Sequence, residues 1–159
     1  MIVIGIDPGL ANIGYGVIDF GEEWLALAYG RIKTGSETPT EVRLKEIFER
    51  IQELLKEHSP EYLVIERQFF NRNITNAIAV GKASGVIALS AALNQVPVVE
   101  VTPLEVKGAL CGFGRAKKQE VGMIVKEMLG VTKLTKDSGD ALACALCYKI
   151  KKENKFLEI

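Results

Sequence analysis

Between residues 25 and 101 the sequence alternates short apolar segments with two helical ones, and this alternation constrains the fold more than any other feature. Residues 41–58 place apolar side chains at helical spacing with charged residues on the other face, and residues 74–94 form a second helical segment rich in small residues. Strands are predicted at residues 25–32, 62–66 and 96–101. Strand, helix, strand connections favour parallel pairing with a right-handed crossover, so the sequence predicts an α/β sheet.

Two more strands precede this region and three helices follow it. Residues 2–6 form an apolar run, Pro8-Gly9 turns the chain, and residues 15–18 resume an extended pattern that forms a meander with the third strand. The later helices are predicted at residues 103–110, 117–129 and 140–152. We therefore expect a five-stranded mixed sheet with helices on both faces. Because no linker or repeat interrupts residues 1–159, we expect a single domain.

Composition excludes several classes of protein. The chain is 48% hydrophobic and 25% charged, an ordinary globular mixture that argues against disorder. Its 20 basic and 20 acidic residues balance, so the net charge argues neither for nor against a nucleic-acid partner. No leader sequence is visible, and the most lipid-like segment, residues 83–93, is too short to span a bilayer. Three cysteines do not suggest a disulfide framework, and Cys144 and Cys147 lie in an apolar helical run that favours core packing. We expect a cytoplasmic protein with no membrane association.

Four acidic residues stand at the ends of elements that are otherwise apolar. Asp7 and Glu66 each close a predicted strand, and Asp137 and Asp140 precede the apolar stretch of the last helix. If the first and fourth strands are parallel neighbours, Asp7 and Glu66 reach the same edge of the sheet, where open α/β sheets form their sites. The spacing of Asp137 and Asp140 places both near one face of a helix start.

Each of these residues also has an ordinary structural explanation. Asp7 with Pro8-Gly9 is common turn chemistry, and Asp137 with Asp140 resembles a helix N-cap followed by a favourable first-turn charge. Their combination is harder to explain in this way, because two like charges about 4 Å apart repel by ~4 kcal/mol at an effective dielectric near 20. Oxygen ligands suit Mg²⁺ or Mn²⁺ rather than zinc, and two such ions ~4 Å apart can cleave a phosphodiester.

Basic and aromatic residues accompany the acidic ones. An exposed aromatic at Phe69 or Phe70, beside Arg72, could stack on an unpaired base, although a pair of aromatics is usually core. A second set flanks a glycine-rich stretch and precedes a predicted helix start, where backbone amides favour anions. Its members are Lys107, Arg115, Lys117 and Lys118. Ordinary solvated charge is the alternative for any single lysine.

Five segments occur in the order and spacing of a known family. They are Gly5-Ile6-Asp7-Pro8-Gly9, Gly14-Tyr15-Gly16-Val17, Glu66-Arg67-Gln68-Phe69, Gly112-Phe113-Gly114-Arg115-Ala116-Lys117-Lys118 and Asp137-Ser138-Gly139-Asp140-Ala141-Leu142-Ala143. From Ile4 to about Leu146 the chain closely resembles the RuvC family of bacterial Holliday junction resolvases. The resemblance implies a ribonuclease H-like fold and a homodimer. It also implies Mg²⁺-dependent resolution of four-way DNA junctions by paired symmetric nicks, in recombination and DNA repair.

The resemblance also implies roles for individual residues. Asp7, Glu66, Asp137 and Asp140 match the four catalytic acidic positions, which would hold two Mg²⁺ ions per site with Mn²⁺ able to substitute. Lys118 would assist catalysis. The expected DNA contacts are Phe69, Phe70, Arg72, Lys107, Arg115, Lys117 and Lys118, and a branch-migration motor complex of RuvA and RuvB is the implied partner. Some members carry His at the position of Asp137, and the family often has Gln at that of Glu120.

Three other functions compete with this one. The first is a ribonuclease H-like nuclease that acts on RNA, and the second is a junction-binding module without catalysis. The third is a phosphotransferase of the actin and sugar-kinase type, which also opens with a strand, Asp and Gly. Its phosphate loop continues with Thr and Ser hydroxyls where this chain has Leu10-Ala11-Asn12-Ile13, and 159 residues leave no room for a second lobe. The small-residue helix at residues 74–94 is expected to pack against another helix, by hypothesis across a dimer interface.

Overall fold

Five strands form one mixed sheet in the order β3-β2-β1-β4-β5 in this computed structural model, which describes residues 1–68 and 73–157. The strands are β1 (Ile2–Asp7), β2 (Asn12–Phe20), β3 (Trp24–Lys33), β4 (Tyr62–Glu66) and β5 (Val98–Val101). β1, β2 and β3 are antiparallel, whereas β4 pairs in parallel with β1, and β5 in parallel with β4. Because Ile6 pairs with Ile65, the strands β1 and β4 end side by side, which fulfils the condition under which the sequence places Asp7 and Glu66 together.

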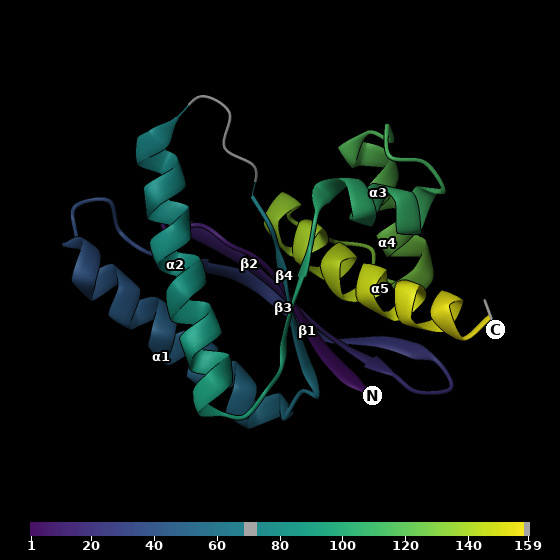
Figure 1. The fold of residues 1–159 in the computed structure, drawn as a ribbon, viewed down its shortest axis with the longest axis horizontal. Coiled ribbons are helices and arrows are strands. Elements are labelled where there is room, and N and C mark those ends of the chain that lie inside the picture. The colour runs from purple at the N-terminus through teal and green to yellow at the C-terminus, as the bar shows by residue number, and fades with distance from the viewer. Residues whose placement is uncertain (69–72, 158–159) are drawn as a thin grey trace.

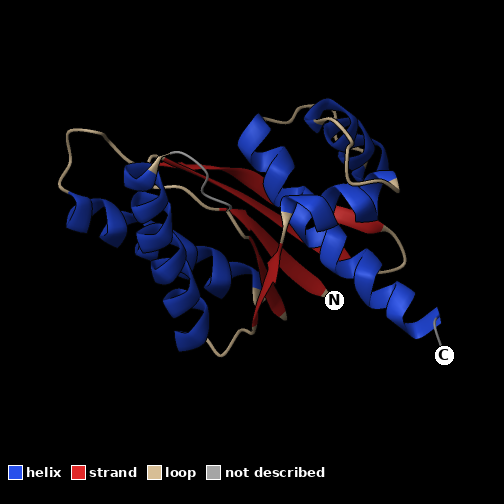
Figure 2. Ribbon diagram, turned by 45° about the horizontal axis from the view of Figure 1, so that its top comes forward, coloured by secondary structure: helices blue, strands red, loops and turns tan. Residues whose placement is uncertain are grey.

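Helices cover both faces of this sheet, which confirms the predicted architecture (Figures 1 and 2). On one face α1 (Thr40–His58) and α2 (Ile74–Leu93) close a core that includes Ile47, Ile51 and Ile87. On the other face lie α3 (Pro103–Cys111), α4 (Lys118–Leu129) and α5 (Lys136–Leu157). Both faces of β1 are therefore covered, which explains why its sequence is a continuous apolar run rather than an alternating one.

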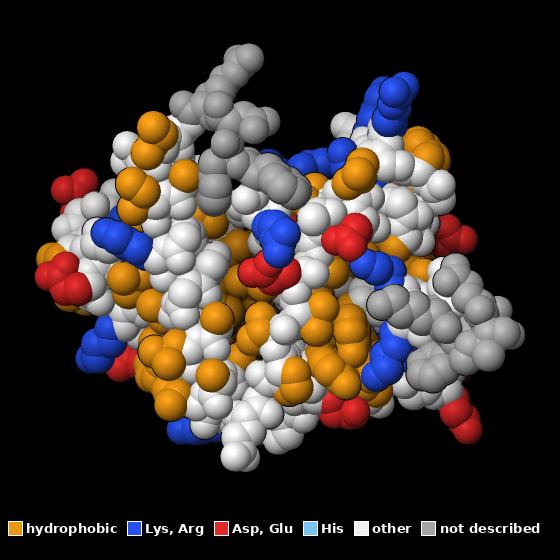
Figure 3. All heavy atoms as spheres, viewed as in Figure 1, with side chains coloured by type: hydrophobic (Ala, Val, Ile, Leu, Met, Phe, Trp, Pro, Cys, Tyr) orange, Lys and Arg blue, Asp and Glu red, His pale blue; other side chains and the backbone are white. Residues whose placement is uncertain are grey.

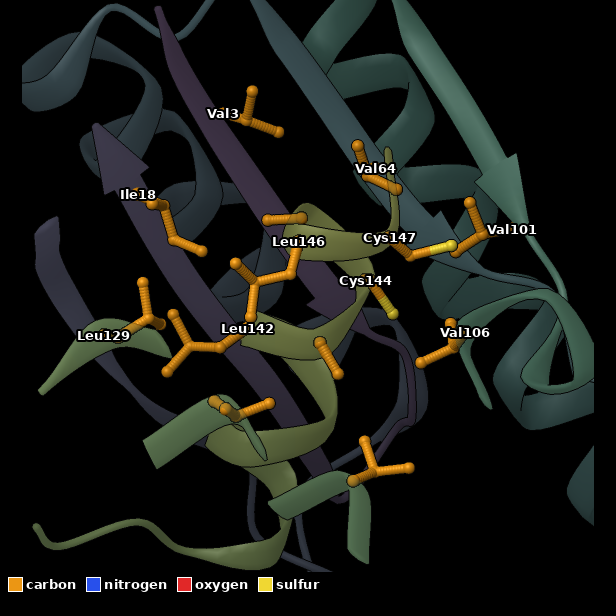
Figure 4. Packing of buried hydrophobic residues seen from close by; sticks show 14 of the residues in the cluster. Val3, Ile18, Val64, Val101, Val106, Leu129, Leu142, Cys144, Leu146 and Cys147 are labelled. Atoms are coloured by element: carbon orange, nitrogen blue, oxygen red, sulfur yellow. The ribbon is translucent and has the colours of Figure 1, made fainter. Parts of the chain in front are cut away.

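The central helix of the second face is α5, which packs directly on the sheet (Figure 4). Leu142 and Leu146 are fully buried, and so are Cys144 and Cys147, as the sequence predicted. Burial raises the pKa of the Cys144 thiol and raises that of Cys147 to about 12, so neither is a reactive thiolate at neutral pH.

Two glycines on the sheet allow α5 to approach closely. A Cβ atom on Gly5 would lie 2.0 Å from the backbone oxygen of Ala141, and one on Gly14 would lie 2.0 Å from the backbone oxygen of Asp137. Any side chain at either position would push the helix away from the sheet. The glycines therefore set how near the first turns of α5 lie to the ends of β1 and β2.

The start of α5 differs from the prediction. The helix begins at Lys136 rather than at Asp140, and its first turn is capped by reciprocal hydrogen bonds between Thr135 and Ser138. The Ser138 backbone N–H donates to the Thr135 hydroxyl at 3.2 Å, and the Thr135 backbone N–H donates to the Ser138 hydroxyl at 3.1 Å. The interpretation of Asp137 as a cap is therefore wrong, because Thr135 caps the helix and the Asp137 carboxylate takes no part in the cap.

Helix α2 is apolar in sequence but partly exposed. By length and composition alone it could cross a membrane, and 28% of its apolar stretch is buried. It is the one such helix in the described ranges, and core helices of globular proteins pass the same test. The sequence prediction considered only residues 83–93, which are the second half of this helix.

Candidate active site

The two strand ends and the first turns of α5 meet around one hollow of about 320 Å³. Asp7 and Glu66 reach it from the sheet, and Asp137 and Asp140 reach it from the helix. Lys118, the first residue of α4, also lines it. The structure thus brings together all five residues to which the sequence assigned catalysis.

Crowding of the carboxylates changes their acidity. The pKa of Asp7 rises from an ordinary 3.8 to about 7, first because the group is buried and then because Glu66 and Asp140 repel its negative charge. The pKa of Glu66 is also raised, again by burial first and by Asp140 second. Lys118 partly offsets both shifts. The site therefore holds more negative charge than its surroundings can stabilise, and a cation bound there would relieve the repulsion.

Gln68 joins the two strand-end carboxylates. Its side-chain nitrogen Nε2 donates to Glu66 Oε2 at 2.8 Å and to Asp7 Oδ1 at 3.3 Å. The sequence analysis gave this residue no role. It could have been found, because Gln68 lies two positions after Glu66 and so points to the same side of an extended chain.

The two carboxylates of α5 each have a cationic partner. Lys118 Nζ donates to Asp140 Oδ2 at 3.0 Å, and Arg31 Nη1 lies 3.5 Å from Asp137 Oδ2. Burial alone would lower the pKa of Lys118, but the hydrogen bond and charge of Asp140 raise it, so this lysine stays protonated. Arg31 comes from β3 and was missed, because its pairing with Asp137 depends on how α5 lies across the sheet.

The donor set fits a hard divalent cation. All four anionic groups are carboxylates, and the side chains of Asn12, Gln68 and Asn76 around them add amide oxygens. In the described part of the chain, no three acidic, histidine or cysteine side chains already meet at one point as ligands of an ion. The N–H donors of Gln68 and Lys118 lie among the carboxylates, so binding would need small side-chain rotations that exchange these donors for a cation.

The predicted DNA contacts fall into two groups. Lys107 lies on α3 and is half-buried, while Arg115 and Lys117 are exposed just before α4. None of the three lines the acidic hollow. Among the described residues the hollow has one further lysine, Lys136, which the sequence analysis did not select.

The remaining predicted contacts cannot be placed. Phe69, Phe70 and Arg72 lie outside the described residues, so their roles stay predictions. Glu120, the position at which the family often has Gln, accepts a hydrogen bond from the backbone N–H of Lys117 at 2.6 Å. The Glu120 carboxylate therefore caps the N-terminus of α4, so it is not an unpaired negative charge facing the DNA.

Comparison with known proteins agrees with this arrangement. Residues 3–148 match the family described as crossover junction endodeoxyribonuclease RuvC. The RuvC proteins of Alkaliphilus metalliredigens and Desulforamulus reducens are 44% and 40% identical to this chain over 93% of its length, and the match covers 92% and 93% of their own.

Solved structures extend the comparison to the fold. The structure of T. thermophilus RuvC in complex with Holliday junction substrate superposes with a TM-score of 0.93 at 35% identity, covering 98% of this chain and 96% of the other. A yeast mitochondrial Holliday junction resolvase, at 15% identity and a TM-score of 0.68, shares the fold alone. The fold is thus ribonuclease H-like, and the chain belongs to the RuvC family of crossover junction endodeoxyribonucleases.

Proposed function

We propose that this chain is a structure-selective endonuclease that resolves four-way DNA junctions by paired symmetric nicks, in recombination and DNA repair. The observation that carries the proposal is the near-complete superposition on T. thermophilus RuvC, whose structure holds a Holliday junction. The hollow lined by four carboxylates supplies the chemistry that such a reaction requires. A junction-binding module without catalysis would have no use for this concentration of buried negative charge.

Mg²⁺ is the cofactor that we propose for this site. Asp7 and Glu66 would hold it from the sheet, and Asp137 and Asp140 from α5, with two ions per site. When bound, the ions supply an activated water and stabilise negative charge on the phosphate and the leaving oxygen. Mn²⁺ prefers the same oxygen ligands and is expected to substitute.

Side chains of the protein contribute positioning and a fixed positive charge. Before a cation binds, Gln68 holds the Asp7 and Glu66 carboxylates in one orientation through its two hydrogen bonds. Lys118 stays protonated and lies at the rim of the hollow, 64% exposed, so that its ammonium group can contact both Asp140 and an incoming phosphate. An N–H donor fixed at this place stabilises charge that develops on the phosphate during cleavage.

A homodimer would supply the second active site for the opposing strand, and α2 carries the surface that suits it. Apolar side chains gather along α2 on the face seen in Figure 3. At helical spacing along this helix lie Ile74, Ile78, Leu89 and Leu93, all more than half exposed, and Gly81 and Gly85, whose Cβ positions have nothing within 4 Å. A second copy packed on this stripe would bury it, and the glycines would allow the close approach of another helix.

The dimer can be tested by its mass in solution. Leu89→Lys places a charge in the middle of the α2 stripe and is expected to yield a monomer by light scattering. Leu25→Lys is the matched control, because Leu25 is 51% exposed on β3, away from α2. A dimer that persists in Leu89→Lys but not in Leu25→Lys would exclude α2 as the interface.

Nuclease activity is tested on an immobile four-way junction. The wild-type protein should nick two opposing strands with Mg²⁺ and neither strand with EDTA, and it should leave linear duplex and RNA–DNA hybrid intact. Asp7→Asn should still bind the junction but not cut it. Asp19→Asn is the control, because Asp19 lies at the opposite end of the β1–β2 pair. Full Mg²⁺-dependent cleavage by Asp7→Asn, or preferred cleavage of the hybrid, would overturn the proposal.

Family membership suggests where such an enzyme works. We include in the proposal a cytoplasmic location and delivery of the junction by a RuvA and RuvB motor complex. The supporting fact is the match to the RuvC family over residues 3–148. Co-purification of the chain with RuvA and RuvB on a four-way junction, and not on linear duplex, tests the partnership.

A further inference from the structure

A groove continues from the acidic hollow along α4 to the far edge of the sheet. The acidic hollow shares Lys118, Lys136 and Asp140 with a second hollow of about 430 Å³ between α4 and the start of α5. This second hollow shares Lys126, Leu134 and Thr135 with a third of about 370 Å³, which reaches Tyr29 and Gly30 on β3. The three hollows therefore adjoin one another along α4. We call the second and third together the lysine groove.

The sign of the charge changes along this path. The acidic hollow collects four carboxylates, but Asp140, at the junction of the two, is the only acidic side chain among the described residues that lines the lysine groove. Four lysines line the groove: Lys118, Lys126, Lys133 and Lys136. Lys126, Lys133 and Lys136 form no ion pair with any described carboxylate, although the chain as a whole has no net charge.

This division of charge matches a polyanion that crosses the active site. A phosphate over the carboxylates has to be neutralised by metal ions, whereas the phosphates beyond it can exchange their salt counterions for cationic side chains of the protein. Lys126 follows Lys118 by just over two turns of α4, which is a rise of ~12 Å. Phosphates along one DNA strand advance ~3.4 Å each along the duplex axis, so this rise corresponds to ~3–4 nucleotides.

We infer that the lysine groove binds the phosphate backbone of the duplex arm that carries the cut strand, with Lys126 and Lys133 contacting phosphates several nucleotides from the cleavage position. The inference rests on the proposed junction-cleaving function and adds to it a path for one arm. Thr132, whose hydroxyl can also donate to phosphate, lies along the same path. The path runs between α4 and β3, separate from the apolar stripe on α2.

Salt dependence of binding provides the test. Each phosphate neutralised by a lysine adds about 0.9 to the slope of log affinity against log salt concentration. The double variant Lys126→Gln/Lys133→Gln should therefore bind a four-way junction with a slope lower by ~1.8. The advantage of the wild-type protein should shrink about tenfold between roughly 50 and 200 mM salt. Fluorescence anisotropy with EDTA measures both without cleavage.

Two further variants identify the cause. Lys126→Arg/Lys133→Arg keeps both charges and should restore the wild-type slope, whereas Lys45→Gln/Lys56→Gln removes the same charge from α1 on the opposite face of the sheet and should change the slope by less than ~0.5. Phosphate-ethylation interference should show the wild-type protein sensitive at ~3–4 nucleotides from the cut and the Gln double variant insensitive there.

The outcomes separate this inference from the proposed function. If the wild-type protein fails to bind a four-way junction, the function itself is wrong. If it binds and cuts the junction, but the Lys126→Gln/Lys133→Gln slope and interference pattern equal those of the wild type, the lysine groove is not the path of the arm. Equal losses in the groove variant and the α1 control would also overturn the inference, because only net charge would then matter.

Discussion

Replacing Asp7 by Asn should stabilise the folded protein while it abolishes cleavage. In the wild-type protein, burial and the neighbouring Glu66 and Asp140 raise the pKa of Asp7 from 3.8 to about 7. Between these two values the folded chain binds more protons than the unfolded one, so its stability falls as the pH rises. Below pH 3.8 the Asp7 carboxylate does not destabilise the fold, and above about pH 7 its destabilising effect is complete.

The size of the effect follows from the same shift. At ~1.36 kcal/mol per pH unit, the rise in pKa corresponds to ~4 kcal/mol of destabilisation at about pH 8. Because the hollow is open to water on one side, this value is an upper bound. At about pH 5 only ~1.6 kcal/mol of it remains. The gain in the free energy of unfolding from Asp7→Asn should shrink accordingly between these two pH values.

Urea denaturation at about pH 5 and pH 8, with EDTA and with about 10 mM Mg²⁺, measures these free energies. Mg²⁺ should raise the stability of the wild-type protein and leave Asp7→Asn nearly unchanged, because a ligand stabilises only the state that binds it. Asp19→Asn serves again as the control. A wild-type stability in EDTA that does not vary with pH, or an Asp7→Asn variant less stable than wild type at about pH 8, would refute the electrostatic reasoning.

Four other substitutions give distinct results. Lys118→Met should slow junction cleavage ~100-fold, because a fixed donor to the phosphate is lost, while junction affinity in an anisotropy assay falls less than tenfold. Gly14→Ala should lower the free energy of unfolding by ~1–3 kcal/mol in urea, because its Cβ would lie 2.0 Å from the Asp137 backbone oxygen, whereas Gly108→Ala on α3, with nothing within 4 Å, should raise it by ~0.5–1 kcal/mol. Glu105→Gln should cost ~0.5–1 kcal/mol at neutral pH as a helix cap is weakened. The hydrogen bond from the Lys151 side chain and those at the α3 N-terminus lower the pKa of Glu105 to about 2. The difference in stability between the wild type and Glu105→Gln should therefore disappear as the pH falls from 4.5 towards 2, which acid titrations followed by circular dichroism measure.

The strand half of the site follows from the sequence by a short physical argument. The apolar runs that end in Asp7 and Glu66 are separated by two strands and the helix α1, and if they pair in parallel their ends coincide at one edge, which is the pairing that the structure has. The helix half was less predictable, because Thr135 rather than Asp137 begins the cap of α5. A Thr three residues before a Ser indicates a helix cap less strongly than an Asp before an apolar run. The stronger pattern therefore predicted the wrong residue as the cap.

Contacts between distant elements lay beyond the reach of the sequence. Arg31 and Asp137 are 106 residues apart, and their pairing depends on the depth at which Gly5 and Gly14 let α5 settle on the sheet. No periodicity within β3 marks Arg31 as different from Lys33. The lysine groove has the same origin, because it is formed by a loop, a helix and an edge strand that are adjacent only after folding.

The division of the acidic site between the sheet and α5 has a consequence for protein synthesis. Glu66 and Asp140 are separated by about 74 residues of sequence. At ~5–20 residues per second, a ribosome needs ~4–15 s to make that segment. A nascent chain that already displays the strand carboxylates therefore lacks the helix carboxylates, and it cannot cut DNA. Activity would appear only once α5 has docked, so a product terminated before Asp137 would lack nuclease activity.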